Sequence, residues 1–164
     1  MNITDVVKLV SDAATKIHAA IGPGCFAKAY EEALYYELVK KGLLVDRQLL
    51  MPVFYEQLII NEAFKIDLLV DQKLVIEIKT VDKVMPVHFK QVKAYLKLLS
   101  LKQGMILNFK SDSVREGIHR IINESGVIVK KQGFCFLKRN TMLLEVALCF
   151  NIARLKYPYD IIIS

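Results

Sequence analysis

Two carboxylates and one lysine lie close together in the sequence, in two short apolar segments joined by a polar turn. Asp67 lies in the segment 64–70, and Glu77 and Lys79 lie in the segment 74–79. If the two segments form a β-hairpin, Asp67 lies opposite Glu77, a pairing that costs a few tenths to about 1 kcal/mol. A divalent cation between the carboxylates removes this repulsion, and paired oxygen ligands suit Mg²⁺ or Mn²⁺. Lys79 then lies where it can orient a water molecule or stabilise negative charge on a phosphate.

The register of this hairpin follows from its apolar residues. A three-residue turn at 71–73 predicts these cross-strand pairs on one face: Val70 with Leu74, Leu68 with Ile76, and Ile66 with Ile78. The same register sets Asp67 opposite Glu77 and Lys65 opposite Lys79 on the other face, and a slip by one residue would mix the two faces. The alternative interpretation is a solvated face on which the two lysines neutralise the two acids, and spacing alone leaves both open.

A helix predicted to start at Pro86 and to run to about Leu99 adds polar side chains. His88, Gln91 and Tyr95 share one face of it, because residues three and four apart are neighbours on a helix. These side chains are candidates for a second wall of the site. Plain surface polarity, or a core tyrosine with a solvated hydroxyl, is the alternative.

The remaining pattern predicts an α/β domain with a central mixed sheet flanked by helices, in the order ααββββαβ. The first helix has a cap at Asn2 or Thr4, and Pro52 marks an edge strand or a bulge. In the second helix we expect Ala29, Ala33, Tyr36 and Leu38 to be buried. The predicted helices cover residues 2–21, 26–41 and 86–99, and the strands cover 44–55, 58–60, 64–70, 74–79 and 105–109, with 114–123 ambiguous between strand and short helix.

Composition places the chain among globular proteins. Its 164 residues suffice for one domain, and 54% hydrophobic with 24% charged residues excludes global disorder. No segment approaches the roughly 20 apolar residues of a membrane span, and the N-terminus lacks the apolar core of a signal peptide, so we predict a cytoplasmic protein. The three cysteines have no CxxC spacing, which argues against a disulfide framework and a zinc site.

The character of the chain changes after Glu124. Residues 1–124 carry 17 basic and 15 acidic side chains, a net charge of +2, whereas residues 125–164 carry 6 and 2, a net charge of +4. We therefore divide the chain into a domain of residues 1–124 and a C-terminal extension of residues 125–164 with no assigned role. The apolar residues of the extension make oligomerisation through it a possible function, and we expect the first domain to fold without it.

Taken together, these motifs resemble a known family. The series Asp67, Glu77-x-Lys79 and Gln91-x-x-x-Tyr95 is similar to that of the PD-(D/E)XK nuclease superfamily, in its RecB-like branch. The segment from Gly22 to Leu34, GPGCFAKAYEEAL, resembles the signature of the GxxExxY protein family within that superfamily. Further phrases typical of that family follow: Pro86-Val87-His88, Leu107-Asn108-Phe109 and Gly117-Ile118-His119-Arg120.

The resemblance covers residues 3–123 and implies a restriction-endonuclease-like core. It implies that Asp67 and Glu77 bind a divalent metal, Mg²⁺ or Mn²⁺, with Lys79 as the third catalytic group and with Gln91 and Tyr95 beside them. The implied reaction is metal-dependent phosphodiester hydrolysis in DNA or RNA, with no further cofactor.

One position departs from the family pattern. Ala27 stands where the signature has glutamate. The resemblance implies that this acid supplies a further metal ligand or orients a metal-bound water, and alanine can do neither. Glu31 lies one turn further along the same helix face and is a candidate replacement ligand. The functions left open are a nuclease weakened by Ala27, a catalytically inactive module that binds nucleic acid or protein, and an interaction protein that assembles through its extension.

Overall fold

The computed structural model of the protein describes residues 1–124. The predicted C-terminal extension and its part in oligomerisation lie outside the described residues. Within residues 1–124, no helix combines the length and the apolar composition that a membrane crossing requires.

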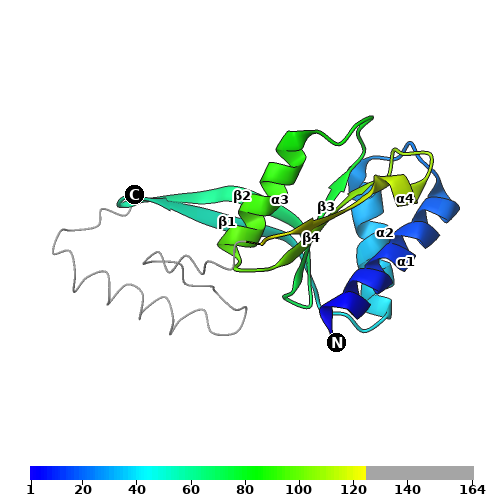
Figure 1. The fold of residues 1–164 in the computed structure, drawn as a ribbon, viewed down its shortest axis with the longest axis horizontal. Coiled ribbons are helices and arrows are strands. Elements are labelled where there is room, and N and C mark those ends of the chain that lie inside the picture. The colour runs from blue at the N-terminus through cyan, green and yellow to red at the C-terminus, as the bar shows by residue number, and fades with distance from the viewer. Residues whose placement is uncertain (125–164) are drawn as a thin grey trace. The chain divides into compact units, whose positions relative to one another are not determined.

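Two helices begin the chain and pack against each other (Figure 1). The first, α1 (Ile3–Ile21), is capped by Asn2, whose side-chain oxygen accepts a hydrogen bond from the Asp5 backbone nitrogen at 2.9 Å. Its buried residues follow the helical spacing that the sequence predicts: Val6, Val7, Val10, Ala13, Ala14 and Ile17. Gly22 ends the helix with a φ of 73°, a left-handed conformation that glycine adopts without a steric penalty.

The second helix, α2 (Ala27–Lys40), does not bury the face that we predicted. Its buried residues are Tyr30, Glu31, Leu34 and Leu38, so of the four expected residues only Leu38 is buried, and Tyr36 is 62% exposed. Alanines lie on several sides of this helix, so they did not indicate which of its faces is buried. The larger side chains at Tyr30, Leu34 and Leu38 decide its orientation, because they bury more apolar area, and Tyr30 stacks on Phe109 with ring centroids 4.4 Å apart.

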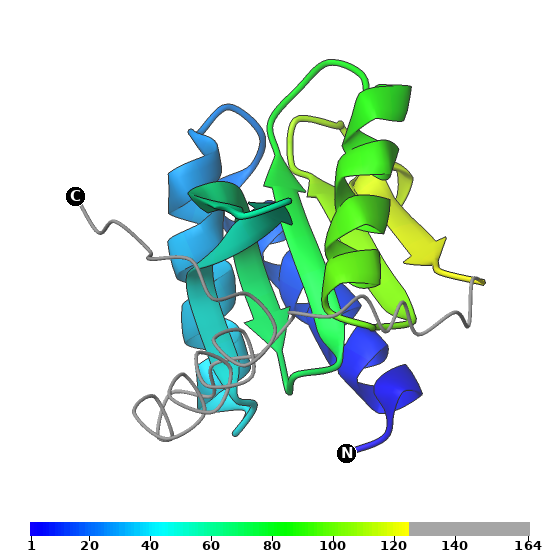
Figure 2. The same ribbon diagram turned by 90° about the vertical axis from the view of Figure 1, so that its left-hand side faces the viewer.

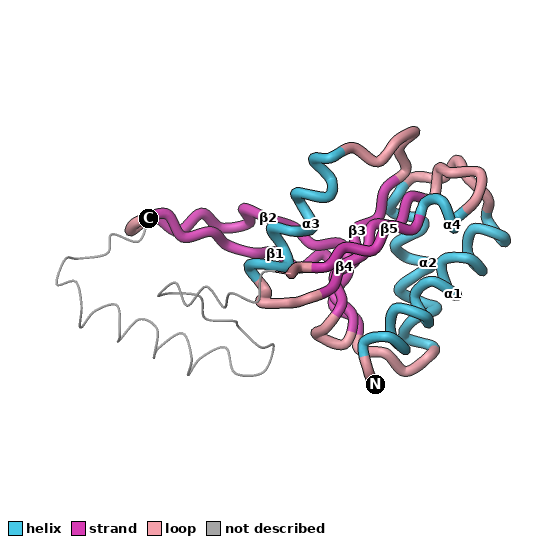
Figure 3. The backbone as a smooth tube through the Cα atoms, in the orientation of Figure 1, coloured by secondary structure: helices cyan, strands magenta, loops and turns pink. Residues whose placement is uncertain are grey.

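A five-stranded mixed sheet forms the centre of the described domain, with the strands in sequence order (Figure 3). The strands are β1 (Val45–Tyr55), β2 (Leu58–Val70), β3 (Leu74–Lys79), β4 (Gln103–Asn108) and β5 (Ile118–Ile122). Only β3 and β4 are parallel, and α3 (Pro86–Leu98) connects them. The other neighbouring pairs are antiparallel. The predicted fold class, an α/β domain with a mixed sheet, is confirmed.

The order of elements differs from the prediction at two places. The two strands expected at 58–60 and 64–70 form a single strand, β2, which pairs with β1 on both sides of residues 61–63, where the register between the strands shifts. The ambiguous segment 114–123 contains both candidates, a short helix α4 (Val114–Gly117) followed by β5. The observed order is therefore ααβββαβαβ.

The β1–β2 hairpin is longer than the strand beside it and projects past the rest of the sheet (Figure 1). β1 is an edge strand, and its register against β2 shifts between Met51 and Val53. This confirms the prediction that Pro52 marks an edge strand or a bulge. Proline has no backbone N–H and so cannot donate a cross-strand hydrogen bond.

Helices α1 and α2 lie on one face of the sheet and α3 lies on the other (Figure 2), and each face carries an apolar core. The first lies between the sheet and helices α1 and α2, and the second lies under α3. Five of the six apolar residues predicted to share one hairpin face lie in the first core: Leu68, Val70, Leu74, Ile76 and Ile78. Ile66 was expected with them but lies in the second core. The β2–β3 pairing ends at Leu68 and Ile76, so Ile66 follows the twist of the β1–β2 ribbon instead.

Candidate active site

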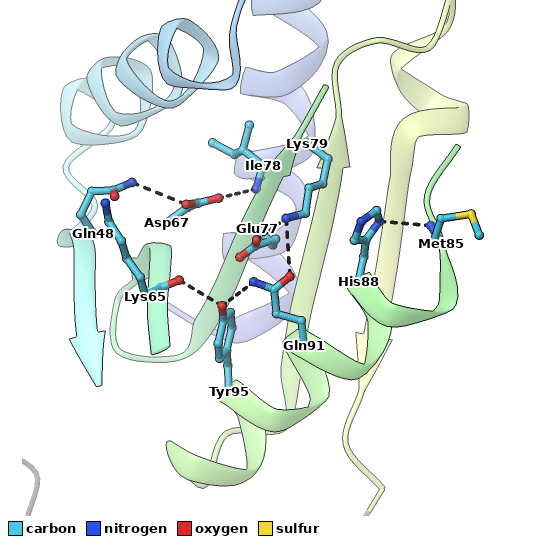
Figure 4. A network of polar contacts seen from close by, with 10 residues as sticks. All are labelled: Gln48, Lys65, Asp67, Glu77, Ile78, Lys79, Met85, His88, Gln91 and Tyr95. Carbon is cyan, nitrogen blue, oxygen red and sulfur yellow. Dashed lines mark hydrogen bonds and ion pairs between the residues drawn. The ribbon is translucent and has the colours of Figure 1, made fainter. Parts of the chain in front are cut away.

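Asp67, Glu77 and Lys79 lie together where β2 and β3 separate (Figure 4). The backbone pairs between these strands follow the predicted register and end at Leu68 with Ile76. Just past this point, Oδ2 of Asp67 accepts a hydrogen bond from the Ile78 backbone nitrogen at 2.8 Å. A carboxylate therefore takes the place that a backbone carbonyl of β2 would hold in a continued ladder, and this contact holds Asp67 near Glu77.

Glu77 is the most deeply buried acid of the described residues, with 3% of its surface exposed. The Lys79 ammonium donates to Oε1 of Glu77 at 2.7 Å. Oε2 is buried and has no hydrogen-bond partner, the only such side-chain atom in residues 1–124. An unsatisfied buried polar atom costs about 1–3 kcal/mol, so a ligand that contacts this oxygen would remove that cost.

Burial changes the acidity of both carboxyl groups. It raises the pKa of Asp67, and the Ile78 hydrogen bond and the Lys79 charge oppose this only in part. Burial also raises the pKa of Glu77, and the nearby charge of Asp67 adds to the effect, whereas Lys79 opposes it. Two acids with raised pKa values resist being ionised together, and a cation bound between them would favour the ionised form of both.

Helix α3 forms a second wall of the site (Figure 4). The Lys79 ammonium donates to Oε1 of Gln91 at 3.5 Å, and the Gln91 amide donates to the Tyr95 hydroxyl at 2.6 Å. That hydroxyl donates to the backbone oxygen of Lys65 on β2 at 3.0 Å. The structure thus places Gln91 and Tyr95 next to the carboxylates. A continuous series of hydrogen bonds links α3 to β2 and holds Lys79 in position.

His88 shares this helical face but acts locally. Its Nδ1 accepts a hydrogen bond from the Met85 backbone nitrogen at 3.1 Å and so caps the start of α3. Burial and the Lys79 charge lower the pKa of His88, which favours the neutral ring that this hydrogen bond requires.

Glu31 does not join the two carboxylates directly. It is 6% exposed, and it accepts hydrogen bonds from Arg47 at 3.2 Å and from the Gln48 amide at 2.5 Å. The Gln48 amide also donates to Oδ1 of Asp67 at 3.5 Å, so one side chain separates Glu31 from the site. Ala27, one turn earlier, packs against the first core. In residues 1–124, His, Cys, Asp and Glu side chains form no group of three that could hold a metal ion.

The sequence pattern assigned no role in the site to Arg47, Gln48 or Asn108. The first two lie on β1 and reach the site only through the tertiary pairing of β1 with β2. Asn108 is buried at the end of β4, where it bonds both backbone groups of Val81, at 3.0 and 2.7 Å. It thereby fixes the loop that follows Lys79. Two signals in the sequence pointed to it, its position at the end of a buried strand and its place in the family phrase Leu107-Asn108-Phe109. Neither assigned it a role, because asparagine is also an ordinary turn residue.

The donor set fits a hard divalent cation. Asp67 and Glu77 offer carboxylate oxygens with unused lone pairs, one of them unpaired and buried. Oxygen ligands of this kind suit Mg²⁺ or Mn²⁺, whereas Zn²⁺ sites are usually built from cysteine and histidine. The adjacent lysine provides a positive charge in a partly buried position, its side chain being 21% exposed.

Comparison with known proteins agrees with this geometry. A family model described as the PD-(D/E)XK nuclease superfamily matches residues 4–121. No curated protein and no solved structure matches the chain. Because the family match covers most of the chain, including both hairpin acids, Lys79 and the whole of α3, the chain belongs to the PD-(D/E)XK nuclease superfamily.

Proposed function

We propose that this protein is a metal-dependent nuclease that hydrolyses phosphodiester bonds in DNA or RNA. Asp67 and Glu77 bind one Mg²⁺ or Mn²⁺ ion, and Lys79 is the third catalytic group. The observation that carries the proposal is Oε2 of Glu77, a buried oxygen without a partner beside a second carboxylate. A structural salt bridge alone would not require that oxygen to remain unsatisfied.

The chain's own residues prepare the site for an anionic substrate. A bound divalent cation supplies Lewis acidity toward a phosphate oxygen and a more acidic water molecule. Glu77 and Gln91 hold the Lys79 ammonium, which stabilises the negative charge that develops on the phosphate. Tyr95 orients Gln91 and is itself fixed to β2, so this lysine needs little reorganisation during the reaction.

Within the superfamily we assign the chain to the GxxExxY proteins and to the RecB-like branch. The support comes from the contacts of the signature residues. The Tyr30 hydroxyl donates to the backbone oxygen of Gly22 at 2.6 Å and accepts from the Cys25 backbone nitrogen at 3.2 Å. The signature tyrosine therefore holds the turn between α1 and α2, which contains the signature glycine, Gly24.

The competing function is a binding module that uses the nuclease fold without catalysis. It is favoured by Ala27, which cannot ligate a metal, and by the pairing of Glu31 with Arg47. In that case the acid one turn further along α2 holds β1 in place. The Gln48 amide donates to both Glu31 and Asp67, so the Glu31 carboxylate contacts the site only indirectly, through that amide.

A cleavage assay with metal titration separates these functions. Labelled single-stranded and duplex DNA and RNA are incubated with the full chain in EDTA, Mg²⁺ or Mn²⁺, and calorimetry measures metal binding. We expect metal-dependent cleavage by the native chain, and its loss in Glu77→Gln and Lys79→Met. Glu62→Gln, an exposed position on β2, is the matched control and should cleave normally. Metal binding without cleavage of any substrate would favour the binding module, and absence of both would refute the nuclease proposal.

A further inference from the structure

A hollow lies beside the first turns of α3, and none of the carboxylate-site residues lines it. Its volume is about 650 Å³, within the roughly 300–1,000 Å³ range of ligand pockets. The lining consists of three lysines, Lys83, Lys90 and Lys93, and of apolar side chains that include Met85, Pro86 and Phe89. It contains no acidic side chain from the described part of the chain.

The three lysines are uncompensated. All three are exposed, and none of the ion pairs found in residues 1–124 includes any of them. By contrast, Lys79 and Lys110 each pair with an acid close by. Three unpaired cations around one hollow attract a polyanion, and lysines spaced along a backbone neutralise successive phosphates.

The apolar floor restricts which polyanion fits. Met85 is 49% exposed, and the half-buried ring of Phe89 is held edge-on against His119 with centroids 5.5 Å apart. A nucleic acid duplex offers phosphates and groove edges, whereas its base faces are stacked inside. Unpaired bases expose apolar faces that pack on aromatic side chains. Cations around an apolar floor therefore match a single strand better than a duplex.

We propose that this hollow binds a single-stranded segment of nucleic acid, with bases against Met85 and Phe89 and phosphates on the three lysines. The choice of ligand rests on the proposed nuclease function. Phe89 and Gln91 are two residues apart on α3 and so lie about 200° apart around its axis. Because Gln91 faces Lys79, the hollow and the catalytic site lie on opposite flanks of the helix. The substrate crosses the start of α3, over exposed Val87, to reach both.

Fluorescence anisotropy of the full chain in EDTA tests this site without cleavage. The probe is a fluorescein-labelled single-stranded DNA of about 16 nucleotides, the upper site size of single-strand-binding folds. Removing two phosphate contacts by Lys90→Glu with Lys93→Glu should weaken binding by about tenfold or more. It should also reduce the slope of log affinity against log salt by about 1.4. Lys8→Glu with Lys41→Glu, exposed on α1 and at the end of α2, makes the same charge change and should alter affinity by less than about twofold.

Two further comparisons test the base contacts. Met85→Ser, a change at an exposed position, should weaken single-strand binding, and native protein should prefer the single strand to its duplex by about tenfold. The proposal would be overturned if the Lys90/Lys93 and Lys8/Lys41 double variants lost the same amount of affinity for the probe. Equal affinity of the native protein for duplex and single strand would also overturn it. Displacement of the probe by poly-glutamate at equal charge concentration would overturn it in favour of an acidic polypeptide. Because the assay omits metal, probe binding at this site together with no cleavage of any DNA or RNA substrate in Mg²⁺ or Mn²⁺ would refute the nuclease function and support the hollow as a binding site.

Discussion

Replacing Glu77 by glutamine should stabilise the metal-free protein near neutral pH while it abolishes metal-dependent cleavage. Oε2 of Glu77 is buried without a partner, which costs about 1–3 kcal/mol. The ion pair with Lys79 offsets part of this cost. Because that lysine is 21% exposed, the pair contributes about 1 kcal/mol. Glutamine keeps an oxygen for Lys79 and removes the buried charge, and its amide NH2 replaces the unpaired oxygen with a donor for the neighbouring Asp67 carboxylate. We therefore expect a net gain of about 1 kcal/mol in unfolding free energy, or roughly 2–4 °C in melting temperature.

The pH dependence of this gain follows from the raised pKa of Glu77. A native pKa above the unfolded value means that the folded state binds the proton more tightly. The stability that this group contributes is complete below the unfolded pKa of about 4.3 and is lost as pH rises through the native pKa. Native protein and Glu77→Gln should therefore differ little near pH 4, and the variant should be the more stable at pH 8.

Urea unfolding in EDTA at both pH values measures this difference, with Glu62→Gln as the exposed control. Mg²⁺ should then reverse the order, because a ligand at 100 times its Kd stabilises the native protein by about 2.7 kcal/mol and the variant has lost a ligand. If Glu77→Gln is less stable than the native protein at pH 8 in EDTA, the Lys79 ion pair outweighs burial and our account of the site is wrong.

Three other substitutions test the surroundings of the site. Gly117→Ala would place a Cβ 2.1 Å from the backbone oxygen of Asn108, so we expect a loss of about 1–3 kcal/mol in urea unfolding; a neutral effect would show that β4 and α4 can separate. Asn108→Ala removes both hydrogen bonds to Val81 and should cost about 1–3 kcal/mol and slow cleavage, whereas unchanged cleavage would separate that loop from catalysis. Ala27→Glu should tighten Mg²⁺ binding in calorimetry, because hard cations favour additional carboxylate oxygens; unchanged affinity would place residue 27 too far from the metal.

The hairpin register could be predicted because the length of the turn fixes which residues pair. Val70 pairs with Leu74 across the three-residue turn at 71–73, and counting along both strands from that pair brings Asp67 to Glu77. Ile66 was misplaced because the same rule assumes a ladder that continues. Nothing in the local pattern shows that the Asp67 side chain ends the ladder by bonding a backbone nitrogen.

The surroundings of the carboxylates depend on tertiary contacts that spacing does not encode. Gln48 reaches Glu31 and Asp67 from a β1 position with a φ of 49°, an unusual conformation for glutamine within a strand. The buried face of α2 was predicted wrongly for a related reason. Its direction depends on the ring of Phe109, at the end of a strand far along the chain, against which Tyr30 stacks.

The hydrogen bond from the Ile78 amide to Asp67 makes a core residue an internal reporter of the catalytic charge. Ile78 is 4% exposed, so its amide is shielded from solvent while it contacts a carboxylate of the site. Hydrogen bonds to ionised acceptors are shorter and stronger than those to neutral ones. The NMR resonance of this single amide should therefore move as Asp67 loses its proton, as a cation binds and as a phosphate arrives, which gives a readout of the site that requires no label on the ligand.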